Sequence, residues 1–207
     1  MILMYIAFTA LCYLIGSIPF GLILTRIFLK TDVRNIGSGN IGATNVMRTG
    51  SKKLGVLTLL LDAGKGALAV WIAYQAQLKL DSSLPWFTYA TYTAMITVVL
   101  GHMFPIWLKF KGGKGVATAL GAIGMFGWPP ALAACAIWIA TFLIFRISAL
   151  SAIIAFTLLP IIAFILPSFG YPMGFYPYAQ TILSILIIAK HHENIKRMLS
   201  KNELTFK

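Results

Sequence analysis

A glycine-rich polar segment, residues 32–48, has the clearest chemical potential in the sequence. Glycines permit backbone conformations in which N–H groups converge on an anion, and nearby hydroxyl groups add further donors. An arginine in the same segment can neutralise a phosphate through paired N–H bonds. A flexible connector would rarely hold an acid, two arginines and three amides in so short a stretch, so we expect phosphate binding. The candidate residues are Gly37, Ser38, Gly39, Gly42, Thr44, Asn45 and Arg48, with Arg34 as an alternative cation.

A second basic segment, residues 109–118, places Lys114 between glycines just before an apolar stretch. A helix that begins there would direct backbone donors toward an anion, and the bare glycines would leave those donors accessible. Lysines that only set membrane topology would explain Lys109 and Lys111, but not the glycine frame. We therefore add Gly113, Lys114 and Gly115 to the candidate phosphate site. Neither segment is a P-loop, because G-x-x-x-x-G-K-[ST] is absent from the chain.

A third polar segment, residues 190–197, contains two adjacent histidines followed by an acid. On a helix, His191 and Asn194 share one face, because positions i and i+3 are neighbours. His191 could act as a general base or position a hydroxyl group, together with Asn194. Adjacent positions on a helix point about 100° apart, so His191 and His192 are poor co-ligands and we expect no metal site.

A fourth polar feature, Asp62 with Lys65, interrupts an apolar stretch. Each charge is costly inside a membrane, and the i, i+3 spacing allows the two charges to neutralise each other. The pair could close a helix bundle or form a wall of the site. Both interpretations stay open, as do the roles of Ser17 and His102.

The composition requires that these segments be positioned by membrane helices. Hydrophobic residues make up 59% of the 207 residues and charged residues only 11%, against about 25% charged in a typical soluble domain. This excludes a soluble globular enzyme and a disordered chain. The two cysteines, Cys12 and Cys135, lie in apolar stretches and predict buried thiols, not a disulfide or zinc framework.

Seven apolar stretches can be delimited. A basic n-region is missing before the first of them, which predicts a retained helix and not a signal peptide. Residues 117–145 are too long for one span and short for two, and Pro129-Pro130 should break a helix there. The stretches are about 2–24, 54–78, 87–108, 117–128, 130–145, 148–167 and 178–190.

Loop charge favours seven spans over six. With seven spans and an extracytoplasmic N-terminus, all 17 basic residues except Lys65 and Lys79 lie on the cytoplasmic side, as the positive-inside rule requires. We therefore predict an all-α integral membrane protein of seven transmembrane helices, with short fourth and fifth helices and a cytoplasmic C-terminus. Residues 1–207 would form a single transmembrane domain. The net charge of +12 then reflects topology and phosphate binding, and we expect no nucleic-acid partner.

These segments together resemble the PlsY-type acyl-phosphate:glycerol-3-phosphate acyltransferases of bacterial membranes. The resemblance covers nearly the whole chain, and its specificity lies in the order of the segments. They are Gly16 to Gly21, Asp32 to Arg48, Leu61 to Gly66, Gly101 to Pro105, Lys111 to Thr118 and His191 to Arg197.

The resemblance implies transfer of a fatty acyl group from acyl phosphate to the sn-1 hydroxyl of glycerol 3-phosphate, giving lysophosphatidic acid and inorganic phosphate in phospholipid biosynthesis. It implies no cofactor, no metal, no acyl-CoA and no acyl carrier protein. The enzyme would be a monomer of the bacterial cytoplasmic (inner) membrane, with its site facing the cytoplasm. Other glycerolipid acyltransferases use H-x-x-x-x-D, and no histidine of this chain has Asp at that spacing.

The roles expected on this basis follow from charge. Lys114 would neutralise the leaving phosphate, with Ser38 as a hydrogen-bond donor in preference to a nucleophile. Arg48, Asn45, His191 and Asn194 would bind glycerol phosphate and orient its hydroxyl group. The general base is His191 or a substrate phosphate. A membrane transporter of a small phosphorylated anion is the alternative function, although transporters usually contain repeats and none is visible.

Overall fold

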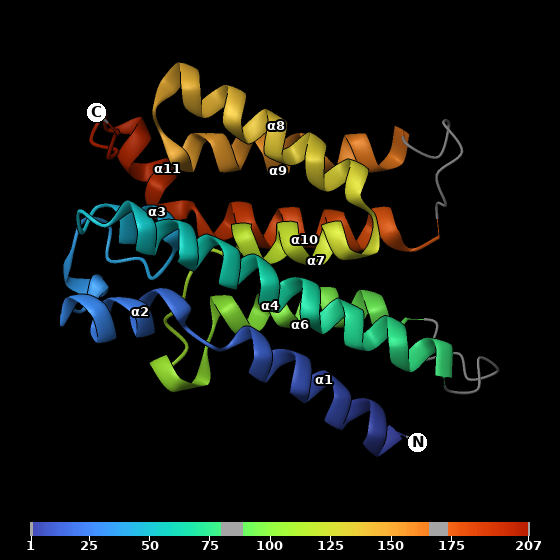
Figure 1. Ribbon diagram of the computed structural model, residues 1–207. Coiled ribbons are helices and arrows are strands. Elements are labelled where there is room, and N and C mark those ends of the chain that lie inside the picture. The colour runs from blue at the N-terminus through green and yellow to red at the C-terminus, as the bar shows by residue number, and fades with distance from the viewer. Residues whose placement is uncertain (1, 80–88, 166–173, 207) are drawn as a thin grey trace. The chain divides into compact units, whose positions relative to one another are not determined.

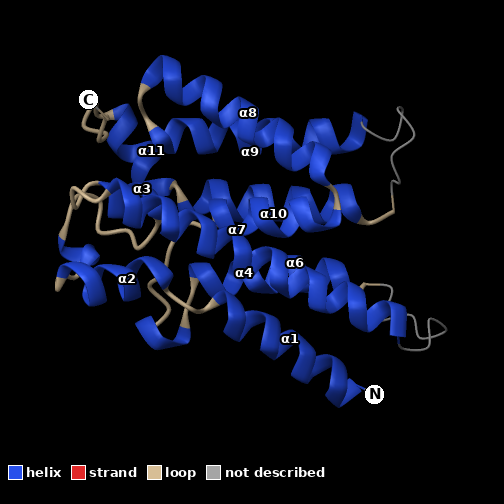
Figure 2. Ribbon diagram, viewed as in Figure 1, coloured by secondary structure: helices blue, strands red, loops and turns tan. Residues whose placement is uncertain are grey.

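Residues 2–79, 89–165 and 174–206 are described by a computed structural model in which every regular element is a helix (Figures 1 and 2). The predicted all-α class is therefore confirmed over these residues. The chain divides into two compact units, Met1–Phe126 and Gly127–Lys207, and each is described here by itself.

Unit 1 is built on the long helix α4. This helix packs along α6 and α7, and α1 packs against α6. The end where α4 begins, α6 ends and α7 begins also holds α2 and α3 (Figure 1). The elements are α1 (Ile2–Gly16), α2 (Phe20–Leu29), the 3-10 turn η1 (Val33–Asn35), α3 (Ala43–Met47), α4 (Lys52–Lys79), α6 (Ala90–Met103), the 3-10 turn η2 (Ile106–Leu108) and α7 (Val116–Phe126).

Glycines allow α4 and α7 to approach each other closely. A Cβ added at Gly66 would overlap the carbonyl oxygen of Thr118, and one added at Gly121 would overlap that of Ala63. Small residues at such positions let two backbones come together, which is the usual packing device of membrane helices. The contact lies beside Asp62 and Lys65, so it places this charged pair at the closest part of the helix packing.

The first apolar stretch is not one helix. The sequence predicts a single helix over 2–24, but α1 ends at Gly16 and α2 begins at Phe20. Pro19 has no N–H to continue a helix, and the residue before a proline is disfavoured in helical conformation. The break at Ser17–Pro19 follows from this.

Unit 2 contains α8 (Trp128–Phe145), α9 (Ser148–Ile165), α10 (Tyr176–Lys190) and α11 (His192–Leu199), and α9 packs against both α8 and α10. The predicted break within 117–145 exists, but it lies at Gly127 and not at the prolines. Pro129 and Pro130 occupy the first turn of α8, where a missing N–H is tolerated. The prediction of a short fifth helix is therefore wrong, because α8 has 18 residues, while α7 is short with 11.

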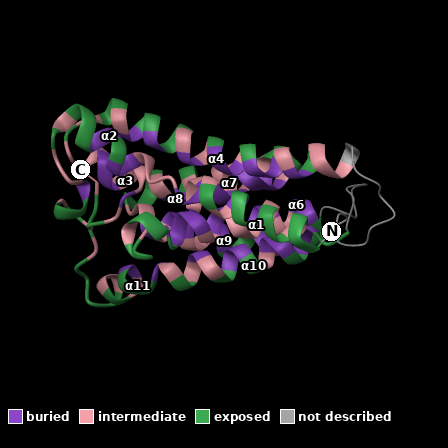
Figure 3. Cartoon of the chain, turned by 90° about the horizontal axis from the view of Figure 1, so that it is seen from below, coloured by how far each residue is buried: buried purple, intermediate pink, exposed green. Residues whose placement is uncertain are grey.

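Among the described residues, five helical segments are long and apolar enough to cross a membrane: Ile2–Leu29, Lys52–Gln77, Ala90–Leu108, Trp128–Phe145 and Ser148–Ile165. Exposed and buried positions alternate along the helices (Figure 3). Many exposed side chains are large and apolar; Leu60 is 62% and Ile144 73% exposed. Apolar side chains exposed in such number suit contact with lipid and not with water.

Candidate phosphate-binding site

Asn45 in α3 organises the glycine-rich loop. Its side chain is buried, and its Oδ1 accepts the backbone N–H of Ser38 at 3.0 Å. Its Nδ2 donates to three backbone carbonyls, those of Val33 (3.0 Å), Ile36 (2.8 Å) and Asn40 (2.9 Å). The whole amide is thus engaged by the loop. The sequence predicts that Asn45 binds glycerol phosphate, whereas its hydrogen bonds suit it to holding the loop that carries Ser38.

The loop turns through two glycines with left-handed backbone conformations, Gly37 (φ +53°) and Gly39 (φ +69°). Residues with a Cβ rarely adopt such angles. A Cβ added at Gly37 would also lie 2.6 Å from Asn45 Oδ1 and 3.0 Å from Arg48 Cδ. The structure therefore brings together Gly37, Ser38, Asn45 and the side chain of Arg48.

The backbone donors of this loop are partly used within it. The N–H of Ser38 binds Asn45, and the N–H of Gly39 donates to the carbonyl of Ile36 at 2.9 Å. The expectation that these two backbone groups converge on an anion is therefore not met. The half-buried hydroxyl groups of Ser38 and Thr44 and the guanidinium of Arg48 are the side chains that this loop offers for anion binding.

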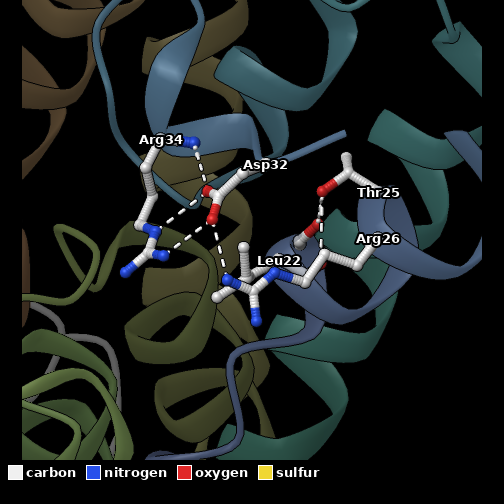
Figure 4. A network of polar contacts seen from close by, with 6 residues as sticks. Leu22, Thr25, Arg26, Asp32 and Arg34 are labelled. Atoms are coloured by element: carbon white, nitrogen blue, oxygen red, sulfur yellow. Dashed lines mark hydrogen bonds and ion pairs between the residues drawn. The ribbon is translucent and has the colours of Figure 1, made fainter. Parts of the chain in front are cut away.

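Asp32 forms an ion pair with Arg34, the alternative cation of the loop (Figure 4). The Asp32 carboxylate accepts from Arg34 Nη2 at 2.6 Å and Nε at 2.9 Å, and from Arg26 Nη2 at 2.8 Å. It also caps η1 by accepting the backbone N–H of Arg34. The hydrogen bonds from Arg34, together with the one from Arg26, hold the pKa of the Asp32 carboxyl well below its usual range. Arg34 therefore serves the structure of the loop.

The second basic segment folds back on the end of α6. The N–H of Gly113 donates to the carbonyl of His102 at 3.0 Å, and that of Gly112 donates to Met103 at 3.2 Å. Gly115 has φ +83° and is buried. Lys114 is half-buried between the two buried glycines, two residues before α7 begins. The predicted glycine frame around Lys114 is thus a fixed turn at the start of a helix.

An apolar cluster underlies the first segment. Three of its four buried members belong to that segment, and Leu108 of η2, the residue just before the second segment, packs against it. The glycine loop and η2 therefore contact the same apolar cluster within unit 1. The buried members are Leu22, Val33, Ile41 and Val46, with Leu54 and Leu108 packed against them.

His191 lies at the corner between α10 and α11, so the third polar segment is not one continuous helix. Its ring is buried, and Nδ1 is 2.7 Å from the carbonyl oxygen of Ile187. A carbonyl only accepts hydrogen bonds, so Nδ1 carries the hydrogen, and Nε2 is the acceptor of the neutral ring. This tautomer is the one in which Nε2 could accept a proton from a hydroxyl group. His192, by contrast, is exposed and contacts Glu193 at the surface.

Asn194 is held by Glu203, a residue that the sequence analysis did not single out. Asn194 Nδ2 donates to Glu203 Oε1 at 2.7 Å, and Arg197 Nε donates to Oε2 at 2.9 Å. Asn194 Oδ1 is buried without a hydrogen-bond partner in the described part of the chain. A buried acceptor of this kind is costly unless a ligand or water donates to it. Of the signals in the sequence, only the scarcity of acidic residues could have drawn attention to Glu203.

Unit 1 offers groups that could bind phosphates, and unit 2 offers groups that could polarise a hydroxyl group. Unit 1 carries two basic, glycine-turned segments, with Ser38, Arg48 and Lys114 as candidate phosphate ligands. Unit 2 carries a histidine of fixed tautomer and an asparagine with an unused buried acceptor. Cation-rich donors of this kind stabilise phosphate oxygens and a developing negative charge.

Comparison with known proteins agrees with this chemistry. The sequence model of the family described as Glycerol-3-phosphate acyltransferase matches residues 6–201. A glycerol-3-phosphate acyltransferase of Rhodopseudomonas palustris (strain HaA2) is 50% identical, covering 96% of this chain and 94% of that protein. One from Jannaschia sp. (strain CCS1) is 48% identical, covering 93% and 88%.

Solved structures are similar over almost the full length. The crystal structure of PlsY (YgiH), an integral membrane glycerol 3-phosphate acyltransferase, in its glycerol 3-phosphate form has a TM-score of 0.84 and 36% identity, covering 98% of this chain and 96% of that one. Its lysophosphatidic acid form has a TM-score of 0.81, also at 36% identity, covering 98% and 95%. The chain thus belongs to the PlsY-type glycerol-3-phosphate acyltransferase family.

Proposed function

We propose that this chain transfers a fatty acyl group from acyl phosphate to the sn-1 hydroxyl of glycerol 3-phosphate, forming lysophosphatidic acid and inorganic phosphate. The observation that carries the proposal is that the glycine-turned loop of Arg48 supplies an apolar cluster against which Leu108 packs, just before the glycine-turned segment of Lys114. Two phosphorylated substrates need two sets of phosphate ligands. Arg48 supplies the positive charge of one set and Lys114 that of the other. Membership of the family supplies the reaction class.

The reaction balances without a covalent enzyme intermediate. The substrate hydroxyl oxygen attacks the carbonyl carbon of the acyl phosphate, and the bond between that carbon and the phosphate oxygen breaks. The leaving phosphate takes the electron pair, and Lys114 neutralises its charge with hydrogen bonds from the Ser38 and Thr44 hydroxyls. Gly37, Gly39, Gly42, Gly113 and Gly115 shape this cradle. Placing both substrates in line can itself supply a large rate factor.

Arg48 binds the phosphate of glycerol 3-phosphate, and the buried Oδ1 of Asn194 accepts a hydrogen bond from the glycerol part. The proton of the attacking hydroxyl goes to Nε2 of His191 or to a substrate phosphate oxygen. The first route is supported by the tautomer that the Ile187 carbonyl imposes on His191. Asn45 keeps its place in the site as the residue that holds the Ser38 loop.

We further propose that residues 1–207 work as one transmembrane acyltransferase domain with seven spans, an extracytoplasmic N-terminus and a cytoplasmic C-terminus. The five long apolar segments, with α7 and α10 as the shorter spans, support this count. The site would face the cytoplasm from the bacterial inner membrane. The enzyme would act as a monomer, without cofactor or metal, and would use neither acyl-CoA nor acyl carrier protein.

A donor comparison tests the proposal. Purified protein receives glycerol 3-phosphate with palmitoyl phosphate, palmitoyl-CoA or palmitoyl acyl carrier protein, and lysophosphatidic acid and free phosphate are measured over time. The proposal predicts equal amounts of both products, with palmitoyl phosphate alone as donor. Product from either thioester at a comparable rate would contradict the proposed donor. Uptake of glycerol 3-phosphate into protein-containing liposomes, without acyl transfer, would indicate a transporter instead.

A further inference from the structure

Three ionisable side chains form a buried cluster in unit 1 that the proposed reaction does not use. Asp62 and Lys65 of α4 and His102 of α6 are 2%, 4% and 4% exposed. Lys65 Nζ lies 2.7 Å from Asp62 Oδ1, and His102 Nδ1 lies 3.5 Å from the same oxygen. Charged and polar groups buried among membrane helices are expensive and usually serve the function.

The cluster is anchored at the break between α1 and α2. Lys65 Nζ donates to the carbonyl oxygen of Ile18 at 2.8 Å, and its ammonium lies 5.6 Å from the centre of the Phe20 ring. Ile18 precedes Pro19, so its carbonyl lies where the helical pattern is interrupted. Lys65 is thereby fixed from two sides, and it fixes the Asp62 carboxylate in turn.

The other end of the cluster touches the glycine frame of Lys114. A Cβ added at Gly113 would overlap the Nε2 edge of the His102 ring. The backbone of Gly113 also donates to the His102 carbonyl at 3.0 Å. His102 therefore meets the residue next to Lys114 with both its ring and its backbone, while its Nδ1 edge faces Asp62.

We infer that His102 is a positioning residue for Lys114, and that Asp62, itself fixed by Lys65, sets the orientation of the His102 ring. The His102 ring packs directly against Gly113, so it determines the position of the turn that carries the Lys114 side chain. This explains why position 113 has no side chain and why an ion pair is buried one helix away from the site. The inference rests on the proposed role of Lys114 at the acyl phosphate.

A positioning role differs in its kinetics from a contribution to folding alone. A small displacement of a group that binds the reacting phosphate can cost up to about a hundredfold in rate. The displacement should affect the substrate that Lys114 contacts and spare the one that Arg48 contacts. Loss of folded protein would instead lower the apparent kcat and leave both KM values unchanged.

His102→Gln is the variant to test, because it removes the ring but leaves the Asp62–Lys65 ion pair intact. We expect the KM for palmitoyl phosphate to rise about tenfold, with the KM for glycerol 3-phosphate within about twofold of wild type. Hydrogen exchange should accelerate in the peptide that contains Gly112 and Gly113. In a Lys114→Ala background, His102→Gln should have no further effect on either KM.

Thr91→Val is the matched control. Thr91 lies on the same helix, is buried, and donates to Gln77 of α4 at 2.9 Å, so its loss also removes a polar contact between α4 and α6. It lies 11 residues from His102, about 16 Å along the helix. We expect unchanged KM values and unchanged exchange in the Lys114 segment.

Gly113→Ala probes the same contact from the loop side and should reproduce the selective rise in KM, even where His102→Gln does not accumulate as folded protein. Wild-type KM values in either folded variant would overturn the inference, as would a further loss from His102→Gln in the Lys114→Ala background. Absence of acyl transfer by the wild-type protein would instead overturn the proposed function, so the two failures are distinguishable.

Discussion

Asn45 and Ser38 are joined by a hydrogen bond of 3.0 Å from the backbone N–H of Ser38 to the side-chain oxygen of Asn45. The same amide group donates to three loop carbonyls. One buried side chain thus fixes the conformation of the loop that presents the Ser38 hydroxyl. The geometry of the loop therefore depends on Asn45.

Asn45→Asp should therefore unfold the loop while barely changing side-chain shape. A carboxylate can still accept from Ser38, but it cannot donate to the three carbonyls, and each unmet buried group costs about 1–3 kcal/mol. We expect a lower melting temperature in detergent and loss of most activity. Asn35→Asp, which adds the same charge at an exposed position of the segment, is the control. A variant that keeps its melting temperature and only raises the KM for glycerol 3-phosphate would show that Asn45 contacts the substrate directly.

Gly37→Ala should abolish activity because the new Cβ meets Asn45 and Arg48, and Gly50→Ala separates this effect from backbone strain alone. Gly37 and Gly50 both have positive φ, +53° and +92°, so alanine at either position costs about 1–2 kcal/mol of backbone strain. At Gly37 the new Cβ also meets Asn45 and Arg48, whereas at Gly50 nothing lies within 4 Å. Thermal melts should show a larger loss of stability in Gly37→Ala than in Gly50→Ala, and initial rates should show activity lost only in Gly37→Ala. Equal activity in the two variants would argue against the Gly37 turn as part of the site.

Asp32→Asn should lower the melting temperature of the protein in a pH-dependent way. The folded state lowers the Asp32 pKa, chiefly through hydrogen bonds from Arg34, so the stabilisation by this carboxylate is complete above its unfolded pKa of about 3.9. It is lost as the pH falls and the carboxylate is protonated. The difference in melting temperature between wild type and Asp32→Asn should be constant from about pH 5 to 8 and shrink below about pH 4. A difference that grows toward low pH would contradict this assignment.

Glu203→Gln should impair glycerol 3-phosphate binding, although Glu203 lies outside the polar segment 190–197. The glutamine loses the charge that binds Arg197 and can accept from only one of the two donors. The Asn194 amide is then free to turn, and we expect the KM for glycerol 3-phosphate to rise by about tenfold or more, as when a charge-assisted hydrogen bond is lost. Lys196→Gln removes an exposed ion pair with Glu193 and should change little. Identical kinetics in both variants would show that Glu203 does not support glycerol 3-phosphate binding.

Local patterns predicted the segments but not their internal contacts. Hydrophobicity, proline positions and glycine clusters are local, and they correctly indicated an all-helical membrane chain with a glycine turn before Lys114. The α1–α2 break at Pro19 was available to the same reasoning and was missed because the apolar run continues through it. The roles of Asn45, Arg34 and Glu203 could not be predicted, because each depends on which backbone or side-chain atoms the folded loop or tail brings near.

The measurement that tests the account most directly is the rate of lysophosphatidic acid formation from palmitoyl phosphate and glycerol 3-phosphate by wild-type protein and Lys114→Ala. Lys114 is proposed to neutralise the leaving phosphate, so its removal should lower the rate by about a hundredfold or more, with an unchanged melting temperature. Lys111→Ala, at an exposed position of the same segment, should retain activity. A folded Lys114→Ala variant that forms lysophosphatidic acid at the wild-type rate would contradict the proposed phosphate site.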